Sequence, residues 1–156
     1  MSVTTDAQKR VDDTGTGRSS AGEKRTVRLP AAPVAAQQAR REVVSDLLVR
    51  DLPASVVEEA EAVVGELVAN AVRHAKPLAD GSVRVHWKVK NGVVEVEVSD
   101  GGGPTVPRPA RPTVWGPSGR GLRIVRSIAH EWGVLEDANG RTVWASIGGP
   151  SRRRSP

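Results

Sequence analysis

The chain has 156 residues, no cysteine and a formal net charge of +5. This length fits one domain with room for tails, and the lack of cysteine excludes disulfides and thiolate metal sites. No secretory signal and no apolar run near the roughly 18 residues of a membrane span are visible, so a cytoplasmic protein without a membrane partner is expected. The basic excess gathers at the two ends, which favours solvated tails over a nucleic-acid interface.

The N-terminal residues are rich in Ser, Thr, Gly, Asp and Lys and show almost no apolar periodicity. This composition predicts a disordered leader over residues 1–24, a folded domain over 25–148 and a basic disordered tail over 149–156. Within the domain, a short strand is expected at 26–29. A helix is expected over 34–48, with Pro33 at its start.

The clearest periodic segment spans residues 54–75. Its apolar residues recur at three- and four-residue spacing, which predicts one long amphipathic helix. Two alternating runs follow, with Val83 to Trp87 in the first and Val94 to Val98 in the second, and Asn91-Gly92 between them predicts a hairpin turn.

Residues 100–118 contain five Pro and four Gly. A loop this long inside a compact domain is usually functional or disordered. After it, residues 119–128 predict a short helix. Residues 132–135 and 141–147 predict a second pair of strands around an Asn139-Gly140 turn.

Three segments carry polar groups suited to a ligand. On the long helix, Glu66, Asn70 and His74 follow one another at four-residue spacing, so they are neighbours along one side of the helix. Asn70 lies at the edge of the apolar stripe and His74 within it. Such side chains either find internal partners or line a cavity that holds a polar ligand.

Asp100 ends a valine-rich strand and is followed by three glycines. A carboxylate here can accept from an exocyclic amine while the glycines let a flat ring approach, although an ordinary Asp-Gly turn is the simpler alternative. The third segment, Gly119-Arg120-Gly121-Leu122, opens a helix whose free N–H groups can cradle phosphate. It is neither a Walker A loop nor a complete dinucleotide fingerprint.

The order of these segments resembles the GHKL, or Bergerat-fold, ATP-binding domain. More narrowly, it is similar to the anti-sigma-factor serine kinases of bacteria and to stand-alone ATP-binding regulators of actinomycetes. The matching stretches are residues 66–75 (ELVANAVRHA), 100–104 (DGGGP), 119–122 (GRGL) and 140–144 (GRTVW). The resemblance implies an α/β (α+β) two-layer sandwich with helices on one face of a mixed, mostly antiparallel sheet, and ATP and Mg²⁺ as ligands.

The resemblance also implies residue roles. Asn70 would coordinate Mg²⁺, and Glu66 would be the catalytic base. Asp100, with Gly102 and Thr142, would hold adenine. His74 would support the ligand-binding residues without touching the ligand itself. The phosphates would lie against Gly119, Arg120, Gly121 and Leu122.

Two functions follow from the resemblance. The first is a serine/threonine kinase that phosphorylates an anti-anti-sigma partner, with sequestration of a sigma factor and homodimerisation left open. The second is a regulator that changes partner with its nucleotide state and does not catalyse transfer. The Pro-rich lid over 105–117 departs from the family pattern, so no phosphate contact is assigned to it.

Overall fold

The computed structural model describes residues 23–103 and 119–148. Its elements are, in chain order, β1 (Glu23–Pro30), α2 (Ala35–Leu48), α3 (Ala54–His74), β2 (Ser82–Lys90), β3 (Val93–Asp100), α4 (Gly119–Ile128), β4 (Glu131–Asp137) and β5 (Gly140–Gly148). Each predicted helix and strand is present. Strand β1 is longer than expected, because Glu23 and Lys24 belong to it and not to the leader. The lid at 105–117, residues 1–22 and the tail lie outside the described residues.

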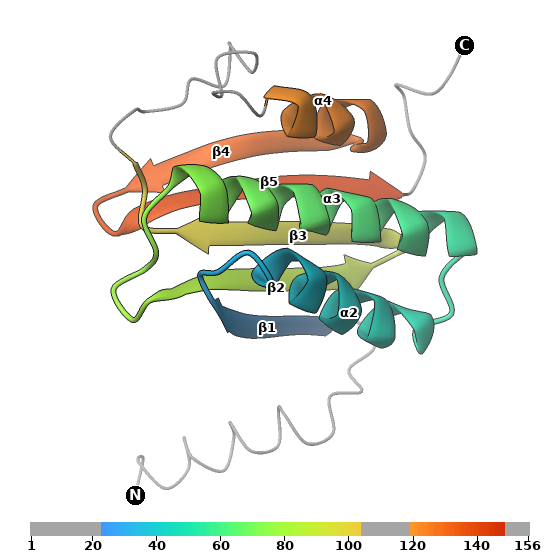
Figure 1. Ribbon diagram of the computed structural model, residues 1–156. Coiled ribbons are helices and arrows are strands. Elements are labelled where there is room, and N and C mark those ends of the chain that lie inside the picture. The colour runs from blue at the N-terminus through green and yellow to red at the C-terminus, as the bar shows by residue number, and fades with distance from the viewer. Residues whose placement is uncertain (1–22, 104–118, 149–156) are drawn as a thin grey trace, which may run out of the picture.

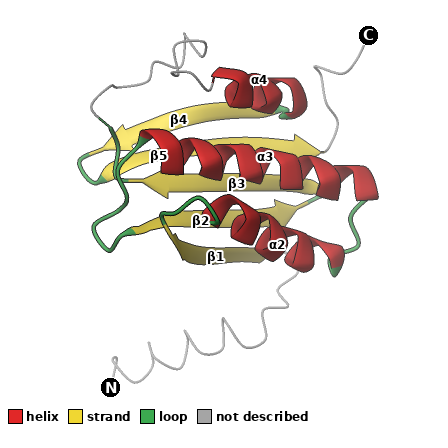
Figure 2. Ribbon diagram, viewed as in Figure 1, coloured by secondary structure: helices red, strands yellow, loops and turns green. Residues whose placement is uncertain are grey.

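The strands form one sheet in the order β1-β2-β3-β5-β4, and every pairing among them is antiparallel. Helices α2, α3 and α4 all lie on the same face of this sheet (Figures 1 and 2). The predicted two-layer sandwich is therefore confirmed, with a wholly antiparallel sheet in the part of the chain described. No helix within that part is long and apolar enough to cross a membrane.

Alternation along the strands decides which side chains enter the core. Val83, Val85 and Trp87 of β2 point toward the helices and are buried, as are Val96 and Val98 of β3. The residues between them face the uncovered side of the sheet, because successive side chains of a strand point to opposite faces. The same rule fixes the directions of the side chains at the end of β3 and the start of β5.

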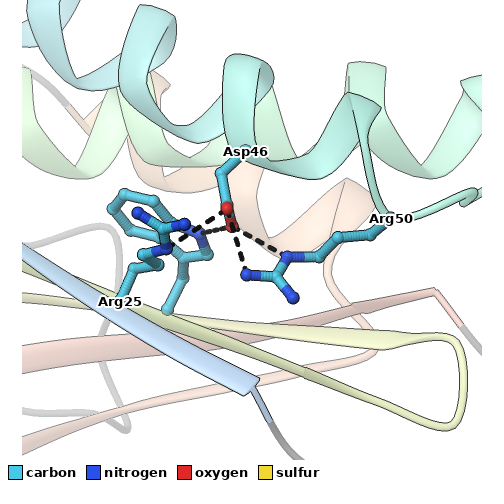
Figure 3. A network of polar contacts seen from close by, with 4 residues as sticks. Arg25, Asp46 and Arg50 are labelled. Carbon is cyan, nitrogen blue, oxygen red and sulfur yellow. Dashed lines mark hydrogen bonds and ion pairs between the residues drawn. The ribbon is translucent and has the colours of Figure 1, made fainter. Parts of the chain in front are cut away.

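A buried carboxylate ties the edge of the sheet to helix α2 (Figure 3). Asp46 accepts a hydrogen bond from the Trp87 indole Nε1 at 2.8 Å and two from Arg50, at 2.9 and 3.0 Å. Arg25 of β1 forms an ion pair with it at 3.3 Å. Buried charges are tolerated where they are paired and hydrogen-bonded in this way, so this cluster anchors β1, α2 and β2 to one another.

Candidate functional site

Two of the three segments expected to bind a ligand are joined at one end of the molecule. The C-terminal end of α3 and the end of β3 lie side by side at the left of Figure 1, whereas α4 begins nearer the middle of that view, above α3. Two backbone hydrogen bonds join the first two segments. Gly101 N–H donates to the Lys76 carbonyl, and Lys76 N–H donates to the Gly102 carbonyl, each at 2.8 Å. The glycine loop is therefore fastened directly to the chain that leaves α3.

The loop after Asp100 requires glycine at each position for a local reason. A Cβ on Gly101 would collide with the Pro77 carbonyl oxygen, and one on Gly103 would lie 3.3 Å from the His74 carbonyl oxygen. Gly102 adopts a φ of 86°, a left-handed conformation that residues with a side chain rarely adopt. The three glycines thus allow the loop to pack against the end of α3 and to turn back toward Asp100.

Asp100 is 2% exposed. Its Oδ1 accepts the Gly102 N–H at 2.7 Å and lies 3.6 Å from Arg141 Nε. Burial raises the pKa of Asp100, while the Gly102 N–H and the Arg141 charge oppose that rise.

Asn70 is 5% exposed on α3, and its amide Nδ2 is buried without a hydrogen-bond partner among the described residues. Buried amides are normally hydrogen-bonded, so this donor has an unmet need for an acceptor among the described residues. Its oxygen suits a hard cation. No group of three His, Asp or Glu that could hold a metal occurs in the described parts of the chain. An Asn70 oxygen would supply one ligand to Mg²⁺, with the remainder from phosphate oxygens and water.

Glu66 and His74 lie one helical turn before and after Asn70, and both are half-buried. The pKa of His74 is lowered, first by burial and then by the charges of Arg73 and Arg141. His74 is therefore favoured as a neutral imidazole at the end of α3. This agrees with a supporting position and does not test a contact with ligand.

Helix α4 begins at Gly119, so Gly119 to Leu122 form its first turn. The first N–H groups of a helix have no partner within the helix, as the predicted phosphate cradle requires. The side chains of Arg120 and Leu122 lie outside the described part of the structure. Phosphate binding at this turn stays a prediction.

The structure places Thr142 apart from Asp100. Thr142 is opposite Ser99 in the β3–β5 pairing, and their hydroxyls are 2.7 Å apart on the face of the sheet that carries no helix. The residue opposite Asp100 on the helix side is Arg141, which is 6% exposed. Arg141 was not among the residues singled out from the sequence. The alternation of β5 around buried Val143 is the signal that indicates it.

A cavity of about 600 Å³ borders the same end of the sheet from the uncovered face. Arg28, Arg84, Ser99 and Thr142 line it, together with turns at 78–80 and 137–140. Neither Asn70 nor the glycines after Asp100 reach it. Asp100 and Arg141 line this cavity too, so it shares a boundary with the predicted base-binding residues.

Comparison with known proteins agrees with this architecture. The RsbU and RsbW domains of Rv1364c from Mycobacterium tuberculosis form a similar solved structure, with a TM-score of 0.62 at 22% identity. The match covers 83% of this chain and 34% of that one, so the present chain spans about a third of its length. No curated protein matches the sequence. The model of histidine kinase-like ATPase domains matches residues 29–147, and the chain therefore belongs to this family of ATPase domains.

Proposed function

We propose that the chain is an ATP- and Mg²⁺-dependent serine/threonine kinase that phosphorylates an anti-anti-sigma-type protein, and that it also binds a sigma factor. One observation carries the proposal. Glu66 lies half-buried one turn before the unpartnered amide of Asn70, on the helix whose end is fastened to the Asp100 loop. The Glu66 carboxylate is thus close to the proposed nucleotide-binding residues and is free of any proposed role in holding the nucleotide.

The nucleotide would lie between α3, the Asp100 loop and the start of α4. The Asp100 carboxylate would accept from the base amine, and Gly102 would leave room for the ring. Asn70 would hold Mg²⁺, which supplies charge neutralisation at the phosphates when bound. The first turn of α4, at Gly119 and Gly121, would bind phosphate oxygens through its N–H groups.

Glu66 would act on the partner's hydroxyl. It removes the proton from a Ser or Thr side chain, and the hydroxyl oxygen forms a bond to the γ-phosphorus. The bond between that phosphorus and the β–γ bridging oxygen breaks, so that ADP leaves and a phosphomonoester remains on the partner. The protein supplies position and charge stabilisation and needs no covalent intermediate.

The second candidate is a nucleotide-dependent binding module without transfer. Asn70, Asp100 and the glycines suffice for it, and the solved relative described as containing an RsbW domain supports a protein partner in either case. The two candidates differ only in whether Glu66 does chemistry. Its replacement therefore separates them.

The test is transfer of label from γ-labelled ATP, with Mg²⁺, to candidate partner proteins. Glu66→Gln should abolish transfer and leave ATP affinity, measured by calorimetry, near that of the unchanged chain. Glu59→Gln is the matched control. It lies two turns earlier on nearly the same side of α3, about 10 Å away along the axis, and is also half-buried.

Asn70→Ala tests the binding half of the proposal. It should weaken ATP binding in the presence of Mg²⁺ far more than in EDTA. Undiminished transfer in Glu66→Gln would refute the role of this carboxylate, and tight ATP binding with no transfer to any partner would favour the binding module. No ATP binding by the unchanged chain would refute both.

A further inference from the structure

Arg141 places a positive charge inside the nucleotide site. Its Nε is 3.6 Å from Asp100 Oδ1, and both side chains are almost fully buried. Its Nη2 extends to the glycine loop, where a Cβ on Gly103 would lie 3.9 Å from it. The guanidinium therefore runs from the carboxylate to the loop that leaves room for the base.

The pairing of the strands holds this side chain in place. Asp100 and Arg141 are direct register partners in the β3–β5 pair. Gly140, the preceding residue, packs so closely that a Cβ on it would collide with the Asp100 carbonyl oxygen. The start of β5 is thus pressed against the end of β3, and Arg141 cannot be moved to the other face without breaking the register.

A carboxylate beside a guanidinium presents an acceptor next to donors. Carboxylates only accept when ionised, and a guanidinium only donates. The matching edge on a nucleobase is an amine next to a ring nitrogen that accepts. The 6-amino group and N1 of adenine form such an edge.

We propose that Arg141 is the second base-reading residue of this site, donating to the ring N1 of adenine while Asp100 accepts from the 6-amino group. The inference rests on the proposed ATP binding and extends it to a residue whose neighbour, Thr142, faces away from Asp100.

A purely structural ion pair is the competing explanation. In that case replacement of Arg141 lowers stability and weakens all nucleotides equally. The two explanations separate with ATP and 1-deaza-ATP, in which a C–H replaces N1 and the amine remains. A hydrogen bond from a charged donor to a buried acceptor predicts that the unchanged chain prefers ATP by about 10- to 150-fold.

The experiment is calorimetric titration of the full chain with each nucleotide and Mg²⁺. Arg141→Met should bring the two dissociation constants to within about twofold, whereas Arg141→Lys, which keeps a donor, should restore part of the preference. Ser146→Ala, on the uncovered face of the same strand, is the control and should keep the full preference. Circular dichroism reports whether each variant is folded.

Three results would overturn the assignment. The first is equal affinity of the unchanged chain for ATP and 1-deaza-ATP. The second is a preference for ATP that persists in folded Arg141→Met. The third is a preference that is lost in Thr142→Val but kept in Arg141→Met. The first of these needs no variant, so misfolding cannot hide it. Failure to bind ATP would refute the proposed function itself, while ATP binding without transfer would refute only the kinase and leave the base-reading assignment intact.

Discussion

Asp46→Ala tests whether the buried cluster beneath β1 is a principal anchor of the fold. The substitution removes the acceptor for the indole N–H of Trp87, a residue that is 1% exposed, and the two Asp46 oxygens that accept from the Arg50 guanidinium. A buried donor without a partner costs about 1–3 kcal/mol. The Arg50 side chain is 12% exposed and loses its ion pair with Asp46, and breaking such a pair costs about 3–5 kcal/mol where both partners are fully buried.

We therefore expect Asp46→Ala to lower the free energy of unfolding by about 3 kcal/mol, measured by urea denaturation. Arg25→Ala is the matched control, because Arg25 meets the same carboxylate at 3.3 Å with its side chain 61% exposed. Its loss should cost no more than about 1 kcal/mol. Asp46→Asn keeps one acceptor for Trp87, so its loss of stability should lie between those of Asp46→Ala and Arg25→Ala. Equal, small losses in all three variants would refute the anchoring role.

Two further predictions concern the site end of the molecule. Gly101→Ala would drive a Cβ into the Pro77 carbonyl oxygen, so it should lower the free energy of unfolding by about 2 kcal/mol and weaken ATP binding. Its control is Gly81→Ala, where a Cβ has open space and the only cost is a left-handed φ of 84°, so the loss should be about 1 kcal/mol. Equal losses of stability in the two variants would contradict the clash. Because burial first, and then Arg73 and Arg141, lower the pKa of His74 from 6.5, the unfolded chain holds more protons just below pH 6.5. Stability should therefore rise with pH in that window. Burial lowers the pKa of His86 as well, although the charge of Glu97 opposes that shift. In urea denaturation at several pH values, His74→Gln and His86→Gln should each remove part of the rise of stability with pH. An unchanged dependence of stability on pH in both variants would contradict the assignment.

The elements of the fold were predictable because their hydrophobic periodicity is local. The long helix α3 shows its apolar stripe in sequence alone, and the β2–β3 hairpin is marked by alternation around Asn91-Gly92. The first residues of β1 carry no such signal. Glu23, Lys24 and Arg25 are all polar, and they are strand residues because they pair with Val89, Lys88 and Trp87 of β2. Pairing between segments this far apart cannot be read from either segment.

The Asp46 cluster escaped sequence analysis for a similar reason. An aspartate in an amphipathic helix is ordinarily a solvated residue, and only the approach of Trp87, 41 positions later, makes it an internal acceptor. Asn70 shows the opposite case. Its place at the edge of the apolar stripe indicated either an internal partner or a ligand, and its Nδ2 has no hydrogen-bond partner among the described residues.

The residues at the start of β5 show how a motif match and strand geometry can point to different atoms. The family resemblance directed attention to Thr142 because it is a threonine in the closing strand. Strand geometry instead selects by parity, since Val143 is in the core and every second residue from it faces the helices. Arg141 and Asp100 both face the helices and form an ion pair with each other. Thr142 lies on the opposite face of the sheet, where its hydroxyl contacts that of Ser99. A one-residue change of register exchanges the two faces completely, so the pairing of β3 with β5 determines which side chain of β5 lies beside Asp100 and could reach a base that Asp100 would hold.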